Sequence, residues 1–118
     1  HFRDFAQVDV VLDIPSSLRT LTDRQRHSLT QIVREGLSNV ARHARATQVK
    51  VKVREIDNRL VLTVEDDGVG FDPEELHNPE NFGLRNMDQR ARQLSGQFVI
   101  QSEPGHGTCL TVQIPFRP

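Results

Sequence analysis

The sequence predicts an α+β domain, a two-layer sandwich in which a mixed five-stranded sheet carries both of its helices on one face. Two observations point to this class. Strand-like segments occur mainly in hairpins, and one long helix follows the first strand whereas a second helix precedes the last pair of strands. Repeated strand–helix–strand units, which a dinucleotide-binding fold requires, are missing from this pattern.

The length of 118 residues suits one compact core, so we expect a single domain over residues 1–118. The sequence opens on His1 without an initiator methionine or a signal peptide. We therefore interpret it as a piece of a longer protein.

The first third of the chain predicts a strand followed by a long helix. Apolar residues alternate from Val8 to Leu12 and then meet Pro15, as in a short strand. Thr22 and Gln25 match a capping box, so a helix begins there. Its buried face is predicted at helical spacing, and the helix is expected to run to about Arg45: Leu29, Val33, Leu37, Val40, Ala41 and Ala44.

The middle of the chain predicts an antiparallel hairpin. From Gln48 to Ile56, valines alternate with basic residues, which indicates a half-buried strand. Asp57 and Asn58 suit a tight turn into a second strand with alternating apolar residues from Leu60 to Val64.

A loop rich in Gly, Asp, Pro and Asn is expected over residues 66–82, and a second amphipathic helix from Leu84 to Leu94 follows it. Gly96 is placed to end that helix as its C′ residue. Residues 98–102 and 108–114 then predict a last pair of strands around a turn at 104–107.

Composition excludes several classes of function. The net charge of -1 and the pI near 6.6 give no broad basic surface for nucleic acid, and no apolar stretch approaches the roughly 20 residues that cross a bilayer. The single cysteine, Cys109, excludes an internal disulfide and a cysteine-based zinc site, and suits a reducing compartment. We expect a cytoplasmic domain without direct membrane contact, whether or not its parent is membrane-anchored.

Three polar residues lie four apart on the long helix: Glu35, Asn39 and His43. Successive members of this set are turned by about 40°, so one helix face presents an acid, an amide and an imidazole. Residue types alone favour a solvated polar face. Gly36 costs about 1 kcal/mol in a helix interior, which is easier to accept if something approaches the backbone closely.

Three glycine-containing segments follow. In DDGVGF, residues 66–71, Asp66 can accept a hydrogen bond from a ligand amine, and Gly68 and Gly70 allow close backbone approach. Gly83 and Leu84 open the second helix, where free amides and the helix dipole favour a phosphate. Gly107 and Thr108 lie in the final hairpin. Each segment alone is typical of a turn or a loop-to-helix junction.

The order and spacing of these segments is more specific than any one of them. ExxxN on a helix, DxGxG after a hairpin, a glycine at a helix start and GxGT before the last strand together resemble the GHKL ATP-binding superfamily. That group includes DNA gyrase, MutL proteins, 90-kilodalton heat-shock chaperones and histidine kinases. The resemblance covers residues 2–118 and implies the GHKL ATPase fold. Residues 33–46 and 82–96 resemble sensor kinases of the nitrate-sensor and desaturase-thermosensor branch.

The resemblance implies a role for each residue of the ATP site. Glu35 would help to activate the attacking group, and Asn39 would hold Mg²⁺ through the phosphates. Asp66 would bind the adenine amine. Gly68 and Gly70 would shape the adenine pocket, Gly83 and Leu84 would lie by the phosphates, and Gly107 with Thr108 would close the far side. His43 falls where the family often places a basic phosphate-facing residue, although an exposed structural histidine fits equally well.

As a function, the resemblance implies transfer of the γ-phosphoryl group of ATP to a histidine on a separate dimerisation domain of the same parent, with a response regulator downstream. The dimerising helical hairpin is missing here, so we expect the isolated domain to be a monomer. Two alternatives are a serine protein kinase of the anti-sigma-factor type and a nucleotide-binding module without catalysis. Retention of Glu35, Asn39, Asp66 and Gly83 disfavours the second. Residues 71–81 are predicted to form a mobile lid that orders over nucleotide.

Overall fold

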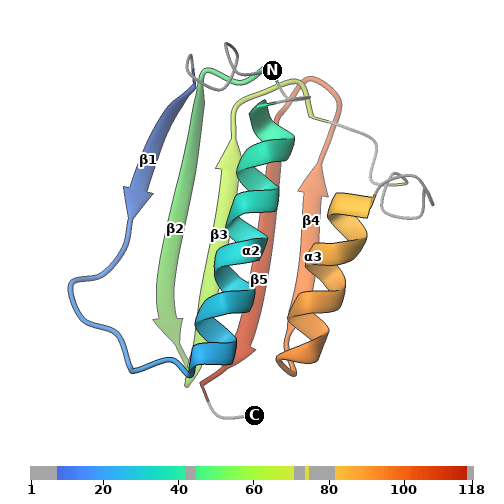
Figure 1. The fold of residues 1–118 in the computed structure, drawn as a ribbon. Helices are drawn as coiled ribbons and strands as arrows, with labels where there is room; N and C mark the ends of the chain where they lie inside the picture. The colour runs from blue at the N-terminus through green and yellow to red at the C-terminus, as the bar shows by residue number, and fades with distance from the viewer. Residues whose placement is uncertain (1–7, 42–44, 71–73, 75–81, 117–118) are drawn as a thin grey trace.

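The computed structural model of the chain describes residues 8–41, 45–70, 74 and 82–116. Its elements, in order, are β1 (Asp9–Asp13), α2 (Asp23–Asn39), β2 (Gln48–Ile56), β3 (Arg59–Asp66), α3 (Phe82–Gln93), β4 (Gln97–Ser102) and β5 (Thr108–Pro115). The sheet has five strands in the order β1-β2-β3-β5-β4. Only the β1–β2 pair is parallel. Both helices lie on one face of the sheet (Figure 1). The predicted fold class is therefore confirmed.

The core fills the space between the helices and the sheet. Alternate residues of the central strands face the helices and are buried, as the period-two pattern predicted. The buried apolar residues of the sheet and helices include Val49, Val51, Leu60, Leu62, Val64, Leu110, Val112, Ile114, Leu29, Ile32, Leu84, Met87 and Ala91. This continuous core fixes α2 and α3 against the sheet.

Gly36 of α2 belongs to this core and faces the sheet. A Cβ atom at this position would meet side-chain atoms of Val64 and Leu110 at 3.6 Å, which is ordinary van der Waals contact. The sequence left open what approaches the helix backbone at Gly36, and in the structure it is the sheet, through the side chains of Val64 and Leu110. Helix–sheet packing occupies that side of α2.

The start of α2 agrees with the predicted capping box. The Thr22 hydroxyl accepts a hydrogen bond from the Gln25 backbone N–H, and the Gln25 side-chain oxygen accepts one from the Thr22 N–H, both at 3.0 Å. The Gln25 amide nitrogen also donates to the carbonyl oxygens of Pro115 and Phe116 at 3.1 Å. The first turn of α2 is thus tied to the end of β5.

Two predicted helix ends need correction. α2 ends at Asn39 and is followed by a wider π-helical turn at residues 40–41, so it stops short of Arg45. Arg45 has a φ of 51°, in the left-handed region, which a right-handed helix does not continue through.

The end of α3 is a Schellman motif that begins one residue earlier than predicted. Ser95, with a φ of 62°, takes the C′ position, and its N–H donates to the Arg92 carbonyl at 3.0 Å. The Gly96 N–H donates to the Ala91 carbonyl at 2.9 Å, as a C″ residue does. Gly96 is required for another reason: a Cβ there would collide with the Gln113 carbonyl oxygen.

The hairpin between β2 and β3 turns at Asp57 and Asn58, as predicted. Their φ values of 52° and 64° are both left-handed, which matches the type I′ turn that suits two-residue hairpins.

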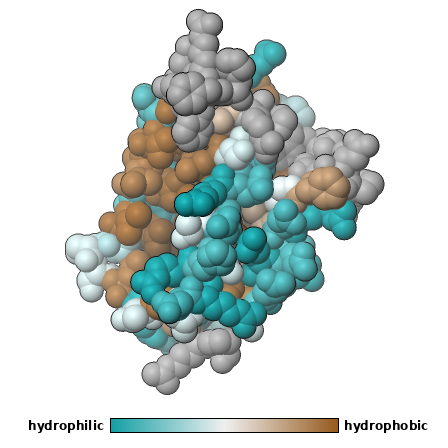
Figure 2. Space-filling view, in the orientation of Figure 1, coloured by the Kyte–Doolittle hydropathy of each residue, from teal (hydrophilic) through white to brown (hydrophobic). Residues whose placement is uncertain are grey.

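The edge strand β1 keeps apolar side chains in solvent. Val10 pairs with Val49 and Leu12 with Val51, so both face the helix side of the sheet, yet they are 45% and 65% exposed. Figure 2 shows a broad apolar area on this side of the molecule. Among the residues that the structure describes, no helix is both long and apolar enough to span a bilayer.

Candidate functional site

The predicted site residues gather at one end of the sandwich. The last turn of α2, the first turn of α3, the end of β3 and the start of β5 all lie at the same end of the sandwich (Figure 1). Hairpin pairing places Asp66, the last residue of β3, opposite Thr108, the first residue of β5. Two groups of residues result, one around Asp66 and one around Glu35.

Asp66 is a half-buried carboxyl group. Its Oδ1 accepts a hydrogen bond from the Gly68 N–H at 2.8 Å. Burial raises the pKa of Asp66 above its ordinary value and the negative charge of Asp67 adds to this, while hydrogen bonds from the backbone of Gly68 and Thr108 act in the opposite direction. A carboxylate in such surroundings gains from a further donor, for example a ligand amine.

The glycines around Asp66 allow backbones to approach each other. Gly70 and Gly107 have φ values of 70° and 78°. A Cβ at Gly107 would collide with the Asp66 carbonyl oxygen, and a Cβ at Gly70 would collide with that of Glu103. The DxGxG loop and the GxGT turn therefore pack directly against each other.

Ser102 supports this contact and was not found from the sequence. Its hydroxyl donates to the Gly107 carbonyl at 3.0 Å and lies 2.8 Å from the Thr108 hydroxyl oxygen. A buried serine at the end of an otherwise apolar-alternating strand was the available signal. Ser102 fixes the turn that approaches Asp66.

The second group joins the two helices. A Cβ at Gly83 would lie 2.9 Å from Oε2 of Glu35 and 3.4 Å from Oδ1 of Asn39. The start of α3 is thus in direct contact with the carboxylate and the amide on α2. Any larger residue at Gly83 would displace the Glu35 side chain.

Leu84 was also predicted to lie in the site, but its side chain is buried in the core and only 2% exposed. A contact of this residue with a phosphate would have to come from its backbone N–H, at the dipole-positive end of α3. His43 and Asn81, and the predicted lid at residues 71–81 apart from Glu74, lie outside the described residues.

Asp67 follows Asp66 in the DDGVGF motif, and no role of its own was predicted for it. Its Oδ1 accepts hydrogen bonds from the Thr47 and Gln48 backbone N–H groups at 2.9 and 3.0 Å, and its other oxygen accepts one from the Thr47 hydroxyl. The Thr47 hydroxyl is the largest cause of a lowered Asp67 pKa. The hydrogen bonds of the Asp67 carboxylate therefore go to the chain itself, at Thr47 and Gln48.

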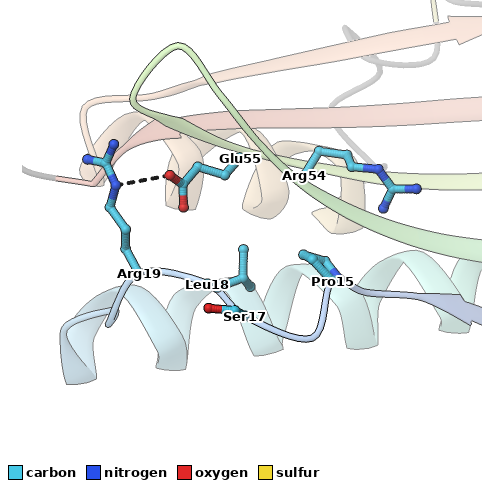
Figure 3. A pocket seen from close by; sticks show the side chains of 6 residues that line it. All are labelled: Pro15, Ser17, Leu18, Arg19, Arg54 and Glu55. Carbon is cyan, nitrogen blue, oxygen red and sulfur yellow. Dashed lines mark hydrogen bonds and ion pairs between the residues drawn. The ribbon is translucent and has the colours of Figure 1, made fainter.

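A hollow at the opposite end of the sheet lies between the segment after β1 and the end of β2 (Figure 3). Its charged side chains are already paired. The Arg19 Nε contacts Glu55 at 3.0 Å, and Arg54 contacts Asp13 at 2.8 Å. It is lined by Pro15, Ser17, Leu18, Arg19, Arg54 and Glu55. None of the predicted site residues lies there.

Comparison with known proteins decides the family. The family model described as "Histidine kinase-, DNA gyrase B-, and HSP90-like ATPase" matches residues 24–118. The chain belongs to this ATPase family.

Within the family, sensor kinases are close relatives. The chain is 38% identical over 88 residues to the signal transduction histidine-protein kinase/phosphatase DegS of Brevibacillus brevis, a match covering 75% of this chain and 22% of that protein. It is 37% identical over 97 residues to the kinase/phosphatase UhpB of Salmonella typhimurium, covering 82% and 19%. The chain therefore spans about a fifth of the length of these relatives.

A solved structure agrees with this relationship. The histidine kinase domain of the blue-light activated kinase EL346 from Erythrobacter litoralis superposes with a TM-score of 0.80 at 25% identity, over 93% of this chain and 52% of that one. The chain is thus an ATP-binding catalytic domain of the sensor histidine kinase type, and the predicted GHKL fold is confirmed.

Proposed function

We propose that this ATPase-family chain binds ATP with Mg²⁺ and transfers the γ-phosphoryl group to a histidine on a separate dimerisation domain of its parent protein. The observation that carries the proposal is the direct contact of Gly83, at the start of α3, with Glu35 and Asn39, at the same end of the sandwich as Asp66. Phosphoryl transfer depends mainly on positioning and charge neutralisation, and this arrangement supplies groups for both.

At the adenine end, the Asp66 carboxylate is suited to accept a hydrogen bond from the exocyclic amine of adenine. Guanine carries a carbonyl oxygen at that position, which a carboxylate would repel. Gly68 and Gly70 would shape the adjoining loop. Gly107 with Thr108, whose turn packs against that loop, would close the far side of the nucleotide site. Specificity for adenine would then come from one half-buried group that favours a donor.

At the phosphate end, the backbone N–H groups of Gly83 and Leu84 lie at a helix N-terminus, where anions are favoured. Asn39 offers an amide oxygen, a ligand type that Mg²⁺ accepts alongside phosphate oxygens and water. When bound, Mg²⁺ would neutralise charge on the phosphates. His43 would add a basic group to this end.

Glu35 is proposed to be the catalytic acid–base group. It lies one helical turn from Asn39 and touches Gly83, so its carboxylate is held beside the phosphate end. There it would orient the attacking imidazole and accept its proton. Positioned carboxylates of this kind typically contribute about 10² to 10⁴ in rate.

The partners follow from this reaction. The phosphoacceptor is a histidine of the dimerisation domain, and a response regulator would receive the phosphoryl group afterwards, in the cytoplasm. The relatives named as histidine-protein kinases support this choice over an anti-sigma-factor-type serine kinase.

The test supplies the chain and the purified dimerisation domain of its parent with γ-labelled ATP and Mg²⁺. We expect a label on the dimerisation domain that is lost in acid and stable in base, as phosphohistidine is. An acid-stable label would instead favour the serine kinase. Asn39→Ala should abolish transfer and weaken Mg²⁺-dependent ATP binding, because it removes the proposed metal ligand.

A further inference from the structure

Asp67 has no role in the reaction described above, yet its side chain accepts three hydrogen bonds from the chain. Its side chain accepts from both backbone and hydroxyl of Thr47 and from the backbone of Gln48. Its own N–H donates back to the Gln48 carbonyl at 3.4 Å. Asp67 therefore holds the short segment Thr47–Gln48 through both its side chain and its backbone.

This segment is a junction between elements. Gln48 is the first residue of β2, and the Thr47 carbonyl accepts a hydrogen bond from the Asp9 N–H at the start of β1, at 3.0 Å. The same segment follows the connection that leads from α2. Through its hydrogen bonds to Thr47 and Gln48, Asp67 connects the loop after β3 to the β1–β2 side of the sheet.

The hydrogen bonds of Asp67 affect the neighbouring residue, Asp66. The backbone of Asp66 is paired with Val49 on one side and with Thr108 on the other. Beyond Asp66 the chain leaves the sheet, and the hydrogen bonds of Asp67 fix the direction in which it leaves. The Asp66 carboxylate takes its orientation from this backbone, and it is held there by hydrogen bonds from the backbone of Gly68 and Thr108.

We propose that Asp67 is a positioning residue for adenine recognition: its clamp on Thr47 and Gln48 sets the direction in which Asp66 presents its carboxylate to the ligand. The inference rests on the proposed adenine contact of Asp66 and adds a residue that determines its specificity. In this role Asp67 acts through Asp66, because its own carboxylate is bonded to Thr47 and Gln48.

The test measures the dissociation constants of ADP and GDP by calorimetry for the wild-type chain, Asp67→Ala and Asp67→Asn. At metal sites, loss of a residue that orients a ligand side chain lowers affinity by roughly tenfold or more. By analogy, we expect ADP to bind about tenfold more weakly to Asp67→Ala. GDP binding should change little, so the ADP preference shrinks. Asp67→Asn keeps an oxygen for the two backbone donors and should restore most of the preference.

Asp13→Ala is the matched control. Asp13 is likewise a carboxylate held by the protein, through Arg54 at 2.8 Å, but it is half-buried and lies at the far end of β1. Its replacement should leave both dissociation constants unchanged even if it lowers the melting temperature. A loss of stability alone is thereby separated from a loss of positioning.

Thr47→Val removes only the hydroxyl donor and keeps the backbone bonds, so it tests the clamp should Asp67→Ala fail to fold. We expect a smaller loss of ADP preference in the same direction. An unchanged preference in a folded Asp67→Ala, or in Thr47→Val if the former does not fold, would overturn the positioning role. Equal affinity of the wild type for ADP and GDP would instead overturn the adenine contact proposed for Asp66.

Discussion

Asp66 and Asp67 are consecutive aspartates in opposite situations. The Asp67 carboxylate faces the segment Thr47–Gln48 and is supplied with donors by the protein, which lowers its pKa. The Asp66 carboxylate faces the start of β5, is half-buried, and has a raised pKa. A carboxylate satisfied by its own chain stabilises the fold, whereas one whose charge is disfavoured by burial gains more from a donor on a ligand.

Glu35 extends the comparison to the phosphate end, where the largest effect is expected. Glu35→Gln keeps the size of the side chain and its contact with Gly83 but removes the charge. Phosphotransfer to the dimerisation domain should fall by about 10² to 10⁴ while ATP affinity is retained. Near-normal transfer, measured on the preparation used for binding, would show that Glu35 is only a solvated helix residue.

The two aspartates should respond to nucleotide and pH in different ways. Protonation of Asp66 removes the charged acceptor, so ADP affinity should weaken as the pH falls through its raised pKa, beginning at a higher pH than for an ordinary aspartate. The loss should approach that of a charge-assisted hydrogen bond, roughly tenfold or more. Calorimetry across this range should show no such step in Asp66→Asn, which controls for protonation of the adenine ring.

Without nucleotide, substitution of the two aspartates should change the free energy of unfolding in opposite directions. A lowered pKa stabilises the fold above the ordinary aspartate pKa, and this is lost as the pH falls through the lowered value. Asp67→Asn should therefore reduce the free energy of unfolding at neutral pH, and the deficit should vanish in acid. The raised pKa of Asp66 destabilises the folded state at pH values above that pKa, where the carboxyl group must be charged. Asp66→Asn should thus stabilise the unliganded chain at neutral pH. Urea unfolding at several pH values would reveal two effects of the same sign if the assignment is wrong.

The smallest effect is expected at Gly36, which shares α2 with Glu35 and Asn39 but faces the core. An added methyl group meets only ordinary contacts, and alanine is favoured over glycine in a helix interior by up to about 1 kcal/mol. Gly36→Ala should raise the melting temperature and leave nucleotide affinity unchanged. A lower affinity would place a ligand on this side of the helix.

The sequence predicted the fold well because each element has a local signal. The capping box at Thr22, the type I′ turn at Asp57 and the alternation in the strands follow from short-range chemistry. The end of α3 was misplaced because Ser95 adopts a left-handed backbone without being glycine, which residue type does not predict. The end of α2 was misplaced because no glycine or proline follows Asn39 to mark it.

The site was predicted in a different way. The residues around Gly83 and Asp66 were identified by motif order, and the structure brings them to one end of the sandwich. The contacts of Asp67 were missed because they join segments about twenty residues apart in sequence. Those of Ser102 lie within one hairpin, but residue type alone does not show that its hydroxyl faces the turn. What approaches Gly36 was left open because helical spacing alone does not show which face of α2 packs on the sheet.

The central claim is that Asp66 reads adenine, and calorimetry of ADP and GDP binding to the wild type and Asp66→Asn tests it most directly. We predict that the wild type prefers ADP and that Asp66→Asn weakens ADP binding by about ten to a hundredfold, the loss of one charge-assisted hydrogen bond worth roughly 1.5 to 3 kcal/mol. Equal affinity of the wild type for the two nucleotides, or an unchanged ADP affinity in the variant, would contradict the account.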